Sequence, residues 1–386
     1  MKKFQMASIL LLGFFLIIPF ATAQKVETVN GVRIIHNEKE GKWGNNPEIK
    51  LELIRTIGGL DAEDENLAFN APYDIVLDAT GNMYILDTGN KRIQKLNPEG
   101  KFIKTIGRQG QGPGEFQSPH SLDIDKEDNI YVHDSRAMRI QVLTSDGKMK
   151  RLIKFTKFSE GQIRLTRSEL IVMGGRIGLR DLMQNKKPKL LEIVSQDGNI
   201  KKRFGEMRDY KDLNVNSRAN NFNLDSDADG NIYISFMYQN RIEKYYHDGM
   251  RLWNADRILN YGTKVIDKGF IRRDAKSTSF QAPKMNKVSS GISVDGRGRI
   301  WVITLNRQMS LKEMGYVTSS GGVSKTIEPG IEEIDAYKLE VFDSDGILLG
   351  EIPLDHHAHG VRIYGNYLFI WEGNFTKYYQ YEIVDK

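Results

Sequence analysis

The chain has 386 residues, no cysteine and a formal net charge of +5 at pH 7. Without cysteine no disulfide can form, so the apolar core alone must hold the fold together. Acidic and basic residues are interspersed, and so small a charge balance gives no electrostatic footprint for nucleic acid. We therefore expect no nucleic-acid partner.

The first 23 residues have the pattern of a secretory signal peptide. Lys2 and Lys3 form a basic start, an apolar run follows over residues 7–20, and Ala21-Thr22-Ala23 is a cleavage site of small residues. The run is shorter than the roughly 20 apolar residues of a spanning helix, and no later segment reaches that length. We expect a periplasmic or secreted protein without a membrane span or lipoprotein cysteine, with an uncleaved anchor as the alternative.

From residue 72 onward one cassette of short strands and Gly/Asp/Asn turns returns six times. Its two clearest copies, residues 72–107 and 119–153, align with an offset of 47 residues: Asn82 with Asn129, Tyr84 with Tyr131, Asp87 with Asp134, Arg92 with Arg139 and Gly100 with Gly147. A fixed period of about 40–50 residues built from short strands is typical of propeller blades. We predict an all-β chain, a six-bladed β-propeller of four-stranded antiparallel blades.

The ring is predicted to close through an N-terminal strand. Further copies of the cassette cover residues 162–198, 227–249, 291–346 and 359–383, and the last copy holds only three strands. Residues 49–58 resemble residues 101–107, which are the fourth strand of the first copy. Pairing them with the last blade removes open sheet edges, so residues 24–386 are predicted to form one domain.

The repeats carry a family resemblance. Residues 119–134, Pro-x-Ser-Leu-Asp-Ile-Asp-x-x-x-Asn-Ile-Tyr-Val-x-Asp, and residues 87–100 resemble NHL repeats, and the Gly-rich connector 106–119 is similar to the linkers of exported bacterial six-bladed propellers of the NHL/TolB-like group. The resemblance covers nearly all of the mature chain and implies the fold. It leaves the function open, because the group includes ligand binders, sensor domains, lyases and lactonases.

Three long insertions are predicted to share one face of the propeller. Strand direction alternates, so the connections between second and third strands, and between blades, lie on the same side. The insertions at residues 176–189, 254–287 and 304–336 are all of these two kinds. Long loops on a rigid scaffold favour binding. We expect this face to bind a peptide, a glycan or a protein, with mobile surface decoration as the alternative.

The first residues of the innermost strands should surround the mouth of the central channel. In register these are Tyr73, His120, Gly161, Phe222, Ser290 and His359, with Asp74, Ser121 and Asn223 one residue further along. Imidazoles, a tyrosine and a carboxylate suit a small-ligand or ion site. We predict that these side chains bind a ligand. No cofactor is predicted: His120 and His359 are expected to hydrogen-bond water or the ligand, with binding of zinc or calcium as the alternative.

An enzyme at the channel mouth is the second hypothesis. The segment Pro119-His-Ser-Leu122 resembles a histidine-bearing segment of peptidyl-amidoglycolate lyases, which are zinc propellers. That resemblance implies three histidine ligands, and His356 or His357 is the candidate for the third. A lactonase-like hydrolase is the other enzymatic alternative. The sequence favours a non-catalytic binding or scaffolding module, because no nucleophile and base stand at a recognisable spacing.

Several conspicuous residues are interpreted as structural. The pairs Asp87 with Arg92 and Asp134 with Arg139 recur in successive blades, which a catalytic acid would not do, so we expect them to tie turns together. Residues 225–230 imitate an EF-hand calcium loop but lack the glutamate at the twelfth position. They are expected to cap a turn, with a blade-type calcium loop as the alternative. Tyr84, Tyr131, Tyr233 and Trp301 are expected to be packing residues.

Overall fold

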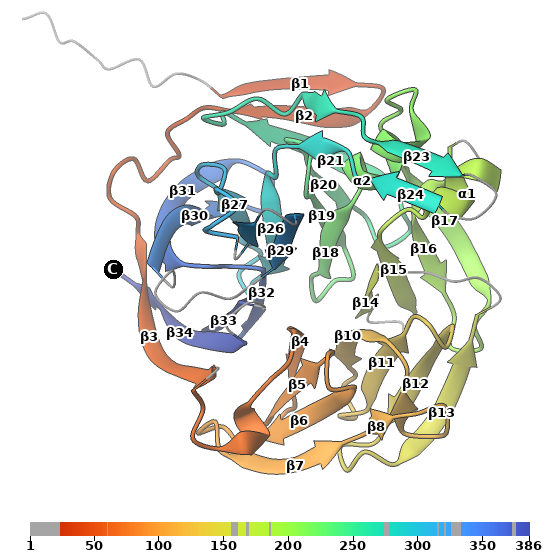
Figure 1. The fold of residues 1–386 in the computed structure, drawn as a ribbon. Coiled ribbons are helices and arrows are strands. Elements are labelled where there is room, and N and C mark those ends of the chain that lie inside the picture. The colour runs from red at the N-terminus through yellow and green to blue at the C-terminus, as the bar shows by residue number, and fades with distance from the viewer. Residues whose placement is uncertain are drawn as a thin grey trace, which may run out of the picture.

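The computed structural model describes residues 24–386 except 60, 156–160, 167–169, 185–186, 274–277, 315, 320–321, 326–332 and 373–375. The predicted signal peptide, residues 1–23, lies outside the described residues. Six sheets surround a central axis, as Figure 1 shows. The prediction of a six-bladed all-β propeller is confirmed. Among the described residues, no helix is both long and apolar enough to cross a membrane.

Blades 1 to 3 are four-stranded antiparallel sheets whose strands follow one another in chain order. Blade 1 is β4 (Pro72–Leu77), β5 (Met83–Asp87), β6 (Arg92–Leu96) and β7 (Phe102–Ile106). Blade 2 is β10 (Pro119–Ile124), β11 (Ile130–Asp134), β12 (Arg139–Leu143) and β13 (Met149–Lys154). Blade 3 is β14 (Gly161–Leu165), β15 (Ile171–Gly175), β16 (Lys189–Val194) and β17 (Ile200–Glu206).

Blades 4 to 6 keep this arrangement, and blades 4 and 6 gain strands from the N-terminal region. Blade 4 is β18 (Phe222–Ser226), β19 (Ile232–Phe236), β20 (Ile242–Tyr245) and β21 (Arg251–Arg257). Blade 5 is β26 (Ser289–Val294), β27 (Ile300–Leu305), β30 (Glu333–Phe342) and β31 (Leu348–His356). Blade 6 is β32 (Gly360–Tyr364), β33 (Tyr367–Glu372), β34 (Lys377–Asp385) and the N-terminal strand β3 (Ile49–Gly58).

Strand β3 closes the ring as predicted. It pairs antiparallel with β34, from Ile49 opposite Asp385 to Gly58 opposite Lys377. Ile57 of β3 is 3% exposed and packs in one cluster with Phe369 and Tyr378 of blade 6 and Ile75 of blade 1. The first and last strands of the propeller are therefore joined in one sheet, side by side in Figure 1.

A hairpin that the sequence analysis did not predict lies outside blade 4. Strands β1 (Lys25–Val29) and β2 (Val32–Asn37) pair antiparallel, and β2 runs parallel to β21, which makes blade 4 a six-stranded sheet. Asn37 of β2 is 3% exposed and accepts a hydrogen bond from the backbone N–H of Leu348 in blade 5 at 2.7 Å. The hairpin therefore ties blade 4 to blade 5.

The turns between first and second strands depend on one recurring aspartate. In four blades its carboxylate accepts hydrogen bonds from the backbone N–H groups two and four residues later; these aspartates are Asp78, Asp125, Asp227 and Asp295. Tyr84 and Tyr233 donate their hydroxyl hydrogens to Asp78 and Asp227. The side chains predicted to be packing residues, Tyr84, Tyr131, Tyr233 and Trp301, are buried.

The predicted aspartate–arginine pairs tie neighbouring connections together. The Nε atom of Arg92 lies 2.8 Å from Asp87, whose other oxygen accepts the backbone N–H of Asn70. Arg139 lies 3.5 Å from Asp134, which accepts the backbone N–H of Ser118. Both carboxylates are fully buried. Each pair anchors the segment that enters its own blade, so the structural interpretation is confirmed.

Short elements occupy the connections. The remaining ones are η1 (Glu65–Leu67), β8 (Arg108–Gln109), β9 (Glu115–Phe116), α1 (Leu179–Gln184), α2 (Leu213–Ala219), β22 (Val265–Asp267), β23 (Phe270–Arg273), β24 (Thr278–Gln281), β25 (Lys284–Met285), β28 (Tyr316–Ser319) and β29 (Gly322–Lys325). Helix α1 and strands β22 to β25, β28 and β29 fall within the three predicted insertions, and α2 belongs to the connection from blade 3 to blade 4.

Candidate functional site

The channel mouth brings together most of the predicted column. Tyr73, His120, Gly161, Phe222 and Asn223 line one cavity, with Gln162, Gly175, Arg176 and Met237. Its volume is about 10 Å³, which is room for a single water molecule. The rings of Tyr73 and His120 meet edge to face with centroids 6.1 Å apart. This cavity is too small for an organic ligand.

The two remaining residues of the column lie outside that cavity. Ser290 is 1% exposed. His359 is half-buried, and its ring centroid lies 6.5 Å from Tyr337 and 6.2 Å from His357. The structure therefore joins the mouth residues of blades 1 to 4 and separates from them those of blades 5 and 6.

The predicted metal ligands do not assemble into a three-ligand site. His120 makes contacts through Nδ1 to the carbonyl of Ser118 at 2.9 Å and to the hydroxyl of Ser135 at 3.1 Å. His356 bonds through Nε2 to the hydroxyl of Tyr381 at 2.7 Å. Within the part of the chain that the structure describes, no group of three or more His, Asp or Glu side chains is placed to hold a metal ion.

A ring of polar side chains, here called the central belt, lies below the mouth. Each innermost strand contributes to it: Asp74 from β4, Ser121 and Asp123 from β10, Arg164 from β14, Asp225 from β18, Ser293 from β26 and Arg362 from β32. Arg362 bonds to Asp74 at 3.0 Å and to Asp225 at 2.9 Å, and Arg164 bonds to Asp225 at 3.1 Å. The contact of Arg362 with Asp225 joins blades 6 and 4, which are not neighbours, and Arg164 also lies 3.7 Å from Asp74, which joins blade 3 to blade 1. These two contacts reach across the channel, whereas the others join adjacent blades.

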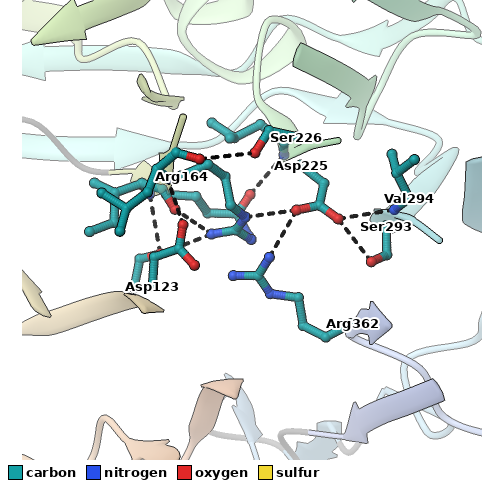
Figure 2. A network of polar contacts seen from close by, with 12 residues as sticks. Asp123, Arg164, Asp225, Ser226, Ser293, Val294 and Arg362 are labelled. Atoms are coloured by element: carbon teal, nitrogen blue, oxygen red, sulfur yellow. Dashed lines mark hydrogen bonds and ion pairs between the residues drawn. The ribbon is translucent and has the colours of Figure 1, made fainter. Parts of the chain in front are cut away.

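The two linking aspartates have matching partners. Asp74 accepts the hydroxyl of Ser121 at 3.0 Å and the backbone N–H of Leu122 at 3.1 Å. Asp225 accepts the hydroxyl of Ser293 at 2.9 Å and the backbone N–H of Val294 at 3.0 Å. Figure 2 shows Asp225 between two guanidinium groups on one side and Ser293 with Val294 on the other. Each carboxylate is held by the next blade as well as by the arginines.

The arginines and burial have opposite effects on the pKa values of the carboxyl groups in the belt. Burial alone would raise the pKa of Asp74, but the charges of Arg362 and Arg164 hold that pKa below its ordinary value. Burial raises the pKa of Asp123 above its ordinary value in spite of the same two arginines. The pKa of Arg362 lies above its ordinary value, because the carboxylates outweigh the effect of burial.

This arrangement changes the interpretation of two predicted ligand residues. Asp74 and Ser121 are both fully buried and bonded to one another and to neighbouring strands. They belong to the framework under the mouth, where their hydrogen-bonding groups are already used. The sequence analysis missed Arg164, Ser293 and Arg362 and assigned Asp225 to a turn. When the blades are aligned, these residues occupy the position that Val76 occupies in blade 1. A polar side chain at this position of an innermost strand was the signal that could have identified them.

A much larger cavity lies beside the mouth. The blade 3 cleft, of about 730 Å³, is lined by residues 176–179, 181 and 188–190 around the first insertion, by Ser217 and Arg218 of α2, and by residues 280, 282 and 283 of the second insertion. Strands and turns of blades 2 and 3 complete it through Lys154, Phe155, Met173, Gly174, Glu192 and residues 198–200, with Asn221. Two of the three predicted insertions therefore meet here.

The cleft has a mixed lining. Its apolar surface includes Ile177, Leu179, Pro283 and Phe280, whose side chain is 57% exposed. Its charged lining residues are Lys154, Arg176, Asp181, Lys189, Glu192 and Arg218. Arg176 lines both the cleft and the small mouth cavity. The cleft is therefore contiguous with the channel mouth.

Hydrogen bonds from α2 hold the walls of the cleft in place. The side chain of Asp212 caps α2 by accepting the N–H of Val215 at 3.0 Å. The amide of Asn214 donates to the carbonyls of Lys268 at 2.7 Å and Gln281 at 3.3 Å. Asn214 is 7% exposed, so the second insertion is fixed to α2 by a buried side chain.

The fold and this cleft define a six-bladed propeller with an elaborated binding face. The chain belongs to the family DUF5128, described as a 6-bladed beta-propeller, which matches residues 51–287. No curated protein matches it. This family assignment establishes the propeller, while the NHL/TolB-like resemblance stays a prediction.

Similar solved structures come from Bacteroides species. A member of the DUF4221 family from Bacteroides vulgatus ATCC 8482 has a TM-score of 0.54 and 11% identity, covering 88% of this chain and 99% of that one. A Bacteroides fragilis NCTC 9343 protein named as exported has a TM-score of 0.54 and 10% identity, covering 92% and 99%. A Bacteroides thetaiotaomicron VPI-5482 protein of unknown function has a TM-score of 0.50 and 14% identity, covering 87% and 76%. Such low identities show the fold alone.

Proposed function

We propose that this chain is a non-catalytic binding propeller that holds its ligand or partner segment in the blade 3 cleft. The observation that carries the proposal is that two insertions from different blades meet around a cavity of about 730 Å³. Binding pockets for organic ligands typically measure about 300–1,000 Å³ and combine apolar walls with a few polar groups. A peptide, a glycan or a loop of a partner protein fits such a site.

The channel itself supports binding over catalysis. An enzyme at the mouth would need polar groups that converge without satisfying one another. In the central belt, Asp74 and Asp225 are instead held by arginines, serine hydroxyls and backbone N–H groups. The lyase hypothesis needs a third ligand beside His120 and His359, and within the described residues no group of three or more His, Asp or Glu side chains is placed to hold a metal ion.

We further propose that residues 1–23 direct the chain out of the cytoplasm. The basic start, apolar run and small-residue cleavage site carry this proposal. A structurally similar Bacteroides fragilis protein is named as exported. The NHL-like repeats and the connector similar to those of TolB-like propellers fit the same assignment.

A ligand screen with a blocked cleft tests the proposed function. Libraries of short peptides, oligosaccharides and metabolites are screened by thermal shift against residues 24–386, and hits are compared with Ala282→Trp, in which an exposed cleft residue becomes bulky. Ala79→Trp on an exposed turn of the opposite face is the matched control. We expect hits to lose at least tenfold in affinity in Ala282→Trp alone. Hits that bind both variants equally well would place the binding site elsewhere.

A further inference from the structure

The charged groups of the blade 3 cleft are unequally paired. Lys189 forms an ion pair with Glu206, and Glu192 forms one with Arg203 at 2.7 Å. Within each pair the two opposite charges neutralise each other, and both pairs lie on the outer strands of blade 3, β16 and β17. Among the residues that the structure describes, no carboxylate pairs with Arg218, which enters the cleft from α2 on its inner side.

Arg218 is held in a fixed orientation. Its guanidinium carbon lies over the Tyr238 ring, 4.5 Å from the ring centre, a cation–π contact that helps to hold the group in place. Its Nε atom is buried and has no hydrogen-bond acceptor. A buried donor without an acceptor costs about 1–3 kcal/mol, so an incoming acceptor at this position would be favoured.

The surroundings of Arg218 add positive potential. Lys287, which precedes β26, has its pKa lowered to about 8 by burial and by the nearby charge of Arg218. The positive charge of Lys287 therefore adds to the potential at Arg218. Next to Arg218 the cleft presents the apolar surface of Ile177, Leu179 and Phe280.

We propose that the ligand of the blade 3 cleft is an organic anion: an apolar body lies against the insertion residues, and its negative group bonds to Arg218. This inference rests on the proposed function and adds the chemical class of the ligand. A planar guanidinium suits a carboxylate, sulfonate or phosphate group, because it can offer two parallel N–H donors.

Two fluorescent dyes of the same shape test the charge requirement. 8-Anilinonaphthalene-1-sulfonate carries a negative charge, and N-phenyl-1-naphthylamine has the same ring system without it. Both are titrated against residues 24–386 and against Arg218→Gln, Arg218→Lys and Ala282→Trp. Arg136→Gln, an exposed arginine in a turn of blade 2 outside the cleft, is the matched control.

We expect the anionic dye to bind the wild type more tightly than the neutral dye. Arg218→Gln should weaken the anionic dye at least about tenfold and change the neutral dye by less than twofold, since a charge-assisted hydrogen bond is lost. Arg218→Lys should retain part of the preference, and Arg136→Gln should change neither affinity. Unchanged melting temperatures show that the variants remain folded.

Other outcomes separate this inference from the proposed function. If Ala282→Trp weakens both dyes but Arg218→Gln has no selective effect on the anion, the cleft binds ligands and the anion inference is wrong. Equal affinity of the wild type for the two dyes, or binding of neither, overturns the anion inference as well. If the dyes bind and Ala282→Trp alters neither, the proposed site itself is wrong.

Discussion

Two aspartates in blade 4 show how neighbouring residues of one type take different roles. Asp227 caps the turn, accepting the backbone N–H groups of Asp229 and Asn231. Asp225, two residues earlier, faces the channel and contacts Arg164 and Arg362. The prediction that residues 225–230 cap a turn is therefore confirmed for Asp227 and wrong for Asp225. The spacing of residues in the sequence identified the turn. The arginines that bind Asp225 come from other blades, so that spacing could not show its role.

His133 should control the acid stability of the protein. It is 1% exposed, its Nδ1 bonds to the carbonyl of Gly161 at 3.0 Å, and burial lowers its pKa to about 4 from 6.5. Between these values the unfolded chain binds a proton that the native state excludes, so stability falls as pH drops from 6.5 to 4. The loss is about 3 kcal/mol at the lower end.

The His133→Gln variant tests this expectation through urea unfolding at pH 7.5, 6, 5 and 4. We expect the decline of the unfolding free energy below pH 6.5 to become shallower by about 2–3 kcal/mol, because no histidine proton is taken up on unfolding at this position. His247→Gln, at an exposed position, serves as the control. An unchanged slope in His133→Gln would show that other groups dominate acid unfolding.

At the scale of elements, the β1–β2 hairpin is an addition that the repeat could not reveal. Its local signal was present: Asn30-Gly31 between apolar strands is typical of a tight hairpin turn, and both residues have positive φ, 51° and 78°. The sequence did not show which strand the hairpin would pair with. It docks on β21, more than 200 residues away, through a parallel pairing.

Asn37 should carry much of the attachment of the hairpin. Its amide donates to the carbonyls of Asp256 at 2.9 Å and Gly346 at 3.0 Å, and its oxygen accepts from Leu348 at 2.7 Å. Asn37→Ala leaves buried backbone groups without partners and should lower the unfolding free energy by about 2–3 kcal/mol. Urea unfolding measures this, with exposed Glu38→Ala as the control; a loss below about 0.5 kcal/mol would contradict the bridging role.

At the scale of the whole molecule, the central belt links blades that have no sheet in common. Arg362 of blade 6 reaches Asp225 of blade 4, and Arg164 of blade 3 lies 3.7 Å from Asp74 of blade 1; neither pair of blades is adjacent in the ring. The apolar core lies mainly between adjacent blades, as where Val76 and Tyr84 pack with Leu122. The belt therefore adds cross-ring contacts to a structure otherwise held by nearest neighbours.

Arg362→Met should destabilise the propeller by about 3–5 kcal/mol, because it leaves two buried carboxylates short of their main cation. Adding Asp74→Asn to this variant should recover part of the loss in a double-mutant cycle. The difference in unfolding free energy between the Arg362→Met variant and the wild type should also narrow at acid pH, where Asp74 accepts a proton. Arg297→Met, which breaks the exposed pair with Asp385, should cost less than about 1 kcal/mol. Equal losses in the two arginine variants would refute the role of the belt.

The sequence alone determined the number of blades and the strand that closes the ring. These depend on local strand and turn chemistry repeated at a fixed spacing, which a single chain displays directly. Only the tertiary structure decided what lines the channel and the blade 3 cleft. Arg164, Asp225 and Arg362 meet from three blades, and the cleft forms where Arg176, Arg218 and Phe280 approach one another across separate connections. Such contacts join residues about 40 to 200 positions apart, and no local pattern specifies them.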